Sequence, residues 1–128
     1  MPKFRLVFAA PLLAALAFAG TAQAHTRLVS SSPAANAIVS KPGRVALTFN
    51  ERVVANFTGV DLAMTSMPGM ASHQPMPITG FTSAMSADGK TLTLQMRRAL
   101  TAGTYQLKWH AVGDDTHRTE GTFSFTVK

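Results

Sequence analysis

His25 directly follows a sequence that has the form of a signal-peptidase site. Ala22-Gln23-Ala24 places small residues at the two positions that the peptidase reads. Cleavage after Ala24 would make His25 the first residue of the mature chain, and its α-amino group and imidazole could then chelate one divalent metal ion. Cleavage after Ala19 would instead leave His25 inside the chain. The cleavage position therefore decides whether this chelate exists.

The segment Asp115-Thr116-His117 offers two further ligands for the same metal. Residues i and i+2 of an extended segment point to one side, and the preceding Gly113 and Asp114 suggest a turn. Together with His25 they supply three nitrogens and one oxygen, a set that suits the tetragonal coordination of Cu(II). A surface turn with a solvated histidine is the alternative interpretation. Because the α-amine must lose its proton to bind, the affinity should fall on acidification.

Glu51, which follows the inward Phe49, is another candidate carboxylate for this Cu(II) site. The alternative is a solvated charge at the end of a strand. His110 sits next to Trp109 on the opposite face of its strand, and we interpret it as a surface residue.

A second group of candidate ligands has soft sulfur donors. Five residues recur at every third position: Met64, Met67, Met70, His73 and Met76. Thioether sulfur needs no deprotonation and suits Cu(I) in an oxidising compartment. The prolines and glycine of this stretch exclude a helix, although a spacing of three would fit one. We therefore predict a methionine-rich Cu(I) loop.

Methionine more often packs in a core, and two methionines have patterns that fit this role. Met96 is in register with Leu92 and Leu94, which predicts a core position. Met64 shares a face with Val60 and Leu62, so it stays open between a core residue and a ligand.

The remaining pattern predicts an all-β fold, an immunoglobulin-like Greek-key sandwich or barrel of about seven strands. Asp88-Gly89 predicts a hairpin turn in which both residues have positive φ. The segment from Leu100 to Tyr105 has the Leu-x-x-Gly-x-Tyr form of a tyrosine corner, although the tyrosine could also open an ordinary strand. The expected strands cover residues 27–31, 45–49, 60–64, 78–81, 92–96, 105–109 and 122–127.

Residues 1–24 have the parts of a secretory signal, with Lys3 and Arg5 before an apolar run that is too short for a membrane span. Residues 25–128 would then form one small domain. Of the 12 basic residues ten remain against six acidic ones, a net charge of +4. These cations form no run, which argues against nucleic-acid binding. No cysteine is present, so neither a disulfide nor a thiolate ligand is available.

The chain resembles the CopC-type periplasmic copper-resistance proteins over nearly its whole mature length. The matching stretches are His25 with 28–31 and Pro33, then 49–51, 64–70, 100–105 and 115–117. One departure is that His73 follows Met70 by three positions, where the family histidine follows its methionine by two.

The resemblance implies a non-enzymatic periplasmic copper carrier with sites at opposite ends of a β-barrel. It implies Cu(II) bound by His25, Asp115 and His117 with Glu51 nearby, and Cu(I) bound by the methionine loop with His73. It also implies an inner-membrane copper transporter and other periplasmic copper-resistance proteins as partners. We expect a monomer, with a metal-bridged dimer as the variant. Two other functions remain open: a histidine-brace copper monooxygenase, and an immunoglobulin-like interaction module without metal.

Overall fold

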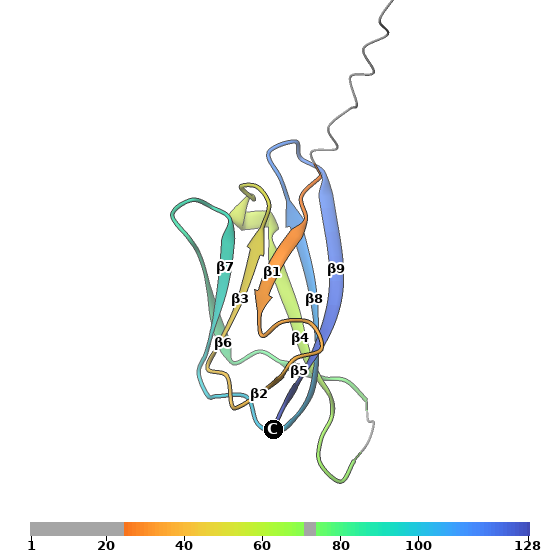
Figure 1. The fold of residues 1–128 in the computed structure, drawn as a ribbon. Coiled ribbons are helices and arrows are strands. Elements are labelled where there is room, and N and C mark those ends of the chain that lie inside the picture. Colours follow the sequence, from red (N-terminus) through yellow and green to blue (C-terminus); the bar gives the residue numbers. More distant parts are fainter. Residues whose placement is uncertain (1–24, 71–73) are drawn as a thin grey trace, which may run out of the picture.

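The computed structural model describes residues 25–70 and 74–128 as two packed β-sheets (Figure 1). The expected signal peptide and His73 lie outside these residues. The first sheet has the order β1-β3-β7-β6, and the second has the order β2-β9-β8-β4-β5. The strands are β1 (Leu28–Ser32), β2 (Ile38–Val39), β3 (Arg44–Phe49), β4 (Gly59–Ser66), β5 (Met76–Ile78), β6 (Phe81–Met85), β7 (Thr91–Met96), β8 (Gly103–Val112) and β9 (Arg118–Val127), with one short 3₁₀ helix, η1 (Ala55–Phe57).

The predicted all-β sandwich is confirmed, and seven of the described strands have five or more residues. Alternation along β3, β7 and β8 sends every second side chain between the sheets. Leu47 and Leu107, for example, are fully buried on opposite sheets. Within residues 25–70 and 74–128, no helix is long and apolar enough to cross a membrane.

The tyrosine corner is also confirmed. The Tyr105 hydroxyl donates a hydrogen bond of 2.7 Å to the backbone oxygen of Thr101, and the side chain is 1% exposed. Its ring stacks on Phe125 at a centroid distance of 5.6 Å. This contact joins the start of β8 to the end of β9 and so fixes one end of the second sheet.

Three details of the expected pattern are wrong. The expected strand over residues 78–81 is two strands, because β5 ends at Ile78 in one sheet and β6 begins at Phe81 in the other. The last strand begins at Arg118, four residues earlier than expected. In the turn between β6 and β7, Gly89 has a φ of +70° but Asp88 does not have a positive φ. The side chain of Asp88 instead accepts hydrogen bonds within the turn.

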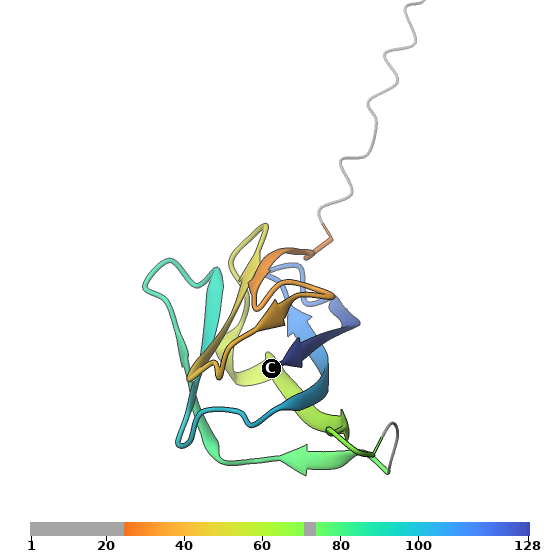
Figure 2. The same ribbon diagram turned by 60° about the horizontal axis from the view of Figure 1, so that its bottom comes forward.

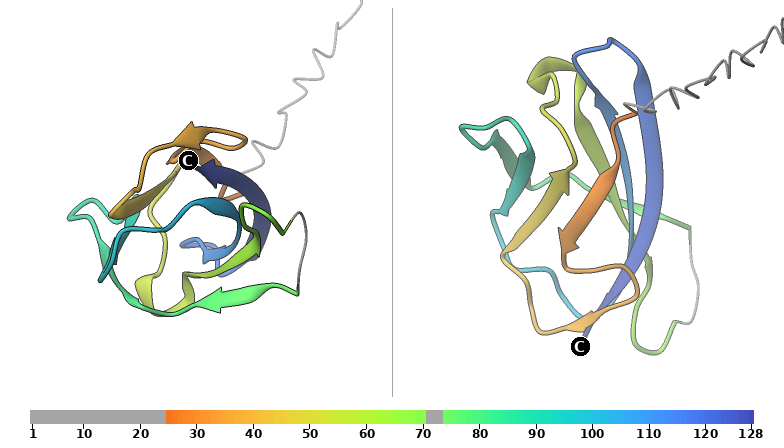
Figure 3. Two further views of the ribbon diagram at one scale, coloured as in Figure 1. Left: turned by 90° about the horizontal axis from the view of Figure 1, so that it is seen from below. Right: turned by 45° about the horizontal axis from the view of Figure 1, so that its top comes forward.

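The strand directions give the sandwich two distinct ends. The upper end in Figure 1 carries the segment before β1, which begins with His25, the residues after β3 and the loop between β8 and β9. The lower end carries β2, the Met67–Met70 turn, the loop between β7 and β8 and the C-terminal residue Lys128. Figure 2 and the view from below in Figure 3 show these lower segments gathered around the end of β9. The two groups of candidate ligands therefore lie at opposite ends.

Candidate metal centres at the two ends

The upper end brings together three of the predicted ligands. One ligand atom from each of His25, Asp115 and His117 lies within 4.8 Å of the others, and all three residues are exposed. The two imidazole rings are 6.0 Å apart between centroids and tilted by 49°. Asp115 Oδ2 and His117 Nδ1 are 3.2 Å apart. One ion could therefore reach all three side chains after small rotations.

A tight turn, and not an extended segment, brings Asp115 and His117 together. The Thr116 amide donates a hydrogen bond of 3.0 Å to the Gly113 oxygen, and Thr116 has a φ of +67°. The His117 amide then donates to Asp115 Oδ1 over 3.1 Å, and β9 begins at the next residue. The side chains of Asp115 and His117 do lie close together, as expected, but a turn places them there and not the alternation of an extended segment.

The same turn keeps the Asp115 carboxyl ionised. The hydrogen bond from the His117 amide is the main cause that lowers the pKa of Asp115 below its ordinary value. Desolvation is the next largest cause and opposes this shift, while the hydrogen bond with the His117 ring and the charges of His117 and His25 lower the pKa of Asp115 further. The carboxylate is the form that binds a metal ion, so Asp115 stays available in mildly acidic solution.

The residues after β3 hold the segment that carries His25. The side chain of Asn50 donates to the His25 backbone oxygen over 3.2 Å and accepts from the Arg27 amide over 2.7 Å. The Asn50 amide donates to the Arg27 oxygen over 3.0 Å. No role was predicted for Asn50 from the sequence, where its signals were a polar residue directly after Phe49 and its place in the matching stretch 49–51. These three bonds fix the direction in which the chain enters β1.

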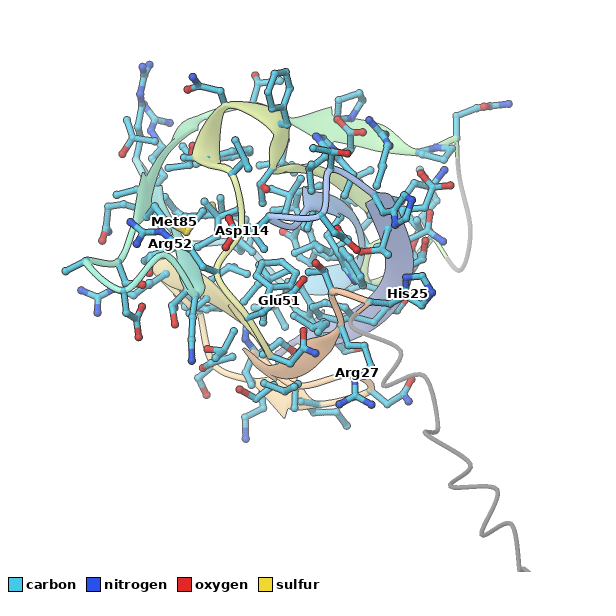
Figure 4. The ribbon with its side chains drawn as sticks, turned by 90° about the horizontal axis from the view of Figure 1, so that it is seen from above. His25, Arg27, Glu51, Arg52, Met85 and Asp114 are labelled. Carbon is cyan, nitrogen blue, oxygen red and sulfur yellow. The ribbon has the colours of Figure 1, made fainter. Side chains whose placement is uncertain are left out.

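Glu51 lies outside the group of three ligands. Its Oε1 accepts a hydrogen bond of 2.6 Å from the hydroxyl of Thr26, which is only 3% exposed. Figure 4 looks down on the upper end and shows Glu51 nearer its centre than His25. A Cβ on Gly113 would lie 2.5 Å from Thr26 Oγ1 and closer still to Glu51 Oε1. The absence of a side chain at Gly113 therefore lets the loop of Asp115 approach the Thr26–Glu51 pair.

The lower end carries the methionines on a tight turn. The amides and oxygens of Met67 and Met70 form two hydrogen bonds of 3.1 and 2.9 Å. Pro68 and Gly69 occupy the corner, and Gly69 has the positive φ that such a turn requires. Met70 is 50% exposed, and Met67 is half-buried against the core. Thioethers on this turn are accessible to a metal ion from solvent.

Met64 and Met76 lie beside the turn as a cross-strand pair of β4 and β5. Met64 is 6% exposed and occupies the space where a side chain on Gly103 would lie, whereas Met76 is 43% exposed. Both line a cavity of about 420 Å³ that also borders Met96. Met64 is therefore a core residue at the wall of this cavity, and Met96 is buried as predicted. The relation of His73 to these residues stays a prediction.

The chain matches known proteins over most of its length. A CopC domain model covers residues 28–128. Copper resistance protein C of Escherichia coli is 44% identical over 84% of this chain and 85% of its own length, and that of Pseudomonas syringae pv. tomato is 41% identical over 98% and 95%.

The similarity extends to solved structures. The crystal structure of PcoC, a methionine-rich copper resistance protein from Escherichia coli, has a TM-score of 0.74 at 41% identity, covering 82% of this chain and 100% of PcoC. The structure of CopC from Methylosinus trichosporium OB3b has a TM-score of 0.66 at 26% identity, with coverages of 81% and 94%. The chain therefore belongs to the CopC family of copper-binding copper-resistance proteins, which are not enzymes.

Proposed function

We propose that this protein is a periplasmic copper carrier that holds Cu(II) at its upper end and Cu(I) at its lower end. The proximity of His25, Asp115 and His117 carries the proposal, because one ligand atom from each lies within 4.8 Å of the others. Signal cleavage after Ala24 adds the α-amine of His25. The resulting set of three nitrogens and one carboxylate oxygen matches the preference of Cu(II).

Asn50 and Glu51 position the N-terminal chelate in this proposal. Asn50 holds the backbone on both sides of Thr26, and Glu51 accepts the Thr26 hydroxyl. Because these hydrogen bonds already fix the backbone at His25, less conformational entropy is lost when its amine and ring bind copper. Glu51 thus acts through Thr26, and direct coordination by Glu51 is the less favoured arrangement.

The soft site uses the exposed methionines of the lower end. Met67, Met70 and Met76 are partly or largely accessible, and their neutral sulfurs suit Cu(I). Met64 contributes from the cavity wall after a change of rotamer, which an unbranched side chain makes easily. His73 is the nitrogen ligand that the sequence adds to this set.

A change in the redox state of copper would move it between these ends. When a reductant gives one electron to bound Cu(II), the product Cu(I) prefers thioether sulfur over amine and carboxylate ligands. The carrier would receive or deliver copper through other periplasmic copper-resistance proteins and an inner-membrane copper transporter. It acts as a monomer in this scheme, and an exposed methionine turn could also share a metal between two copies.

The test is a Cu(II) titration followed by EPR on two forms of the mature protein, residues 25–128. One form begins at His25, and the other carries one extra glycine before it. We expect tight binding of one equivalent with a nitrogen-rich tetragonal spectrum, and a weakened or altered site in the extended form. Equal affinity and identical spectra in both forms would refute the amine-plus-ring chelate.

A further inference from the structure

The lower end of the molecule is covered by basic side chains without acidic ones. Five of the ten cations that follow residue 24 lie there, and all five are exposed: Lys41, Arg44, Arg97, Arg98 and Lys128. Neither of the ion pairs among the described residues involves any of them. Even if a terminal carboxylate on Lys128 is counted, this end stays strongly positive.

Hydrogen bonds between the lower loops keep these cations together. The Leu100 amide donates to the Pro42 oxygen over 3.2 Å, and the Met96 amide donates to the Gly43 oxygen over 2.9 Å. These bonds join the segment of Lys41 and Arg44 to that of Arg97 and Arg98. The Lys128 amide donates to the Val39 oxygen over 2.9 Å, which ties the C-terminal residue to β2. The positive surface is therefore a fixed feature of the fold.

The acidic side chains are all elsewhere. Glu51, Asp88, Asp114 and Asp115 lie in loops of the upper end, and Glu120 is the third residue of β9. Asp61 faces Lys108 across β4 and β8. It lies five residues before the end of β4, which is about 17 Å along a strand. The protein is thus polarised along its long axis, with its positive end at the methionine turn.

Exposed apolar side chains accompany the cations. Ile38 on β2 is 69% exposed, and Met70 and Met76 are 50% and 43% exposed. They come from separate segments that the view from below in Figure 3 places around this end. Cations interspersed with exposed apolar side chains are typical of proteins that lie on a membrane surface.

We propose that this lower end, defined by its five cations together with Ile38, Met70 and Met76, docks on a membrane surface rich in anionic phospholipid headgroups. The cations come from three segments, and of the five only Arg97 and Arg98 line the cavity beside the methionines. A broad charged surface of this kind fits a flat layer of phosphates better than it fits one acidic peptide in a groove. Docking would add the attraction of each cation for the negative surface to the insertion of the apolar side chains.

Docking in this orientation would turn the methionine turn toward the membrane and the upper end away from it. If the proposed Cu(I) site is correct, copper would be presented where a membrane-embedded acceptor can take it. The docking itself depends only on charge and exposure, so it can hold or fail without reference to copper.

The test measures co-sedimentation of metal-free mature protein with vesicles that contain about one third phosphatidylglycerol in phosphatidylcholine, at about 0.05 M salt. We expect binding that is lost at about 0.5 M salt and on pure phosphatidylcholine. The variant Arg97→Gln/Arg98→Gln should bind roughly tenfold more weakly. Its matched control, Arg52→Gln/Lys90→Gln at the upper end, loses the same charge and should bind like the unmodified protein.

The orientation of the protein on the vesicle is measured with a polarity-sensitive dye on a single introduced cysteine, since the chain has no native cysteine. Ala99→Cys lies at the lower end, Ala87→Cys at the upper end, and both positions are exposed. The emission should shift to the blue on vesicles only for the dye at position 99. Equal weakening by both pairs of substitutions, or equal dye shifts, would overturn end-on docking. Failure of the unmodified protein to bind would overturn it too and would favour an acidic protein surface as the partner.

Discussion

The two ends of this molecule hold their candidate ligands in contrasting ways. At the upper end, the segment of His25 is hydrogen-bonded to Asn50, and the candidate ligands Asp115 and His117 are hydrogen-bonded to each other. At the lower end, the described Met67–Met70 turn closes on itself through hydrogen bonds between its own ends. The upper site is thus built from several segments in a fixed geometry, and the lower one is a single exposed turn with adaptable side chains.

Charge reinforces this contrast. Carboxylates gather at the upper end, where they attract a divalent cation, and the cations of the lower end repel any metal ion bound there. If the proposed Cu(I) site is correct, its thioethers would retain Cu(I) less firmly in this positive field than in a neutral one. In that case the upper end would be the better suited to storage and the lower end to release.

The largest effect that we expect is on Cu(II) affinity, and it follows from replacing one histidine at the upper end. His117→Ala removes a proposed Cu(II) ligand and should lower the Cu(II) affinity by at least about 100-fold, because loss of a direct ligand has a larger effect than loss of its supporting hydrogen bonds. The Cu(I) affinity should stay the same. Competition titrations with chelators specific for each oxidation state measure both constants. His110→Ala is the matched control, because His110 lies on β8 outside the ligand group. An equal loss of Cu(I) affinity in His117→Ala would mean that the ends are not independent.

A single added methyl group should disturb the upper end alone. Gly113→Ala would place a Cβ 2.5 Å from Thr26 Oγ1, and overpacking of this kind costs about 1–3 kcal/mol of stability. Separation of Thr26 from Glu51 should also weaken Cu(II) binding by roughly tenfold. Thermal unfolding and Cu(II) titration measure the two effects. Gly43→Ala is the control, since a Cβ there has no neighbour within 4 Å. Unchanged Cu(II) affinity in Gly113→Ala would remove the Thr26–Glu51 pair from the account of the site.

The fold could be predicted wherever its signals are local. Alternation identified the buried faces of β3 and β8, and the Leu-x-x-Gly-x-Tyr pattern located the corner at Tyr105. The division of residues 78–81 between two sheets could not be predicted in this way. Ile78 and Phe81 are both apolar, and what separates them is pairing with Leu62 on β4 and Met96 on β7. Such pairing depends on the whole sheet.

The candidate site shows the same limit. His25, Asp115 and His117 could be selected because few residue types bind metals and their sequence context was distinctive. Asn50 could not be assigned, because its contacts with His25 and Arg27 join residues more than twenty positions apart. The candidate metal ligands could therefore be predicted from the sequence. The residues that hold them in position could be identified only in the structure.

At the lower end, exposure should separate ligands from core methionines. Met70→Leu removes an exposed sulfur and should lower the Cu(I) affinity by about tenfold, while stability changes by less than about 0.5 kcal/mol. Met96→Leu is the matched control, since it keeps nearly the same volume at a buried position and should leave Cu(I) binding unchanged. Cu(I) competition titrations and chemical unfolding measure both quantities. Loss of Cu(I) affinity in Met96→Leu alone would move the soft site from the turn into the cavity.

The smallest effect that we expect is on the pH dependence of stability, through the carboxyl of Asp88. Ser86 Oγ donates to Asp88 Oδ1 over 2.6 Å, and this bond, followed by the one from the Lys90 amide, lowers the pKa of Asp88 below its ordinary value of 3.8. Because the folded pKa is the lower one, the ionised carboxyl stabilises the fold above about pH 4, and this contribution is lost as the pH falls through the lowered value.

Asp88→Asn should therefore lower the Tm at pH 7 by no more than about 2 °C, and the difference from the unmodified protein should shrink toward pH 2–3. Thermal unfolding of the metal-free protein, followed by the fluorescence of Trp109, measures it. Ser86→Ala should reduce the same pH dependence, because it removes the largest single cause of the lowered pKa of Asp88. Both carboxyls with a lowered pKa, Asp88 and Asp115, lie at the upper end, and the lower end has no acidic side chain to titrate. A difference that grows on acidification would show that the ionised Asp88 carboxyl does not stabilise the fold through these hydrogen bonds.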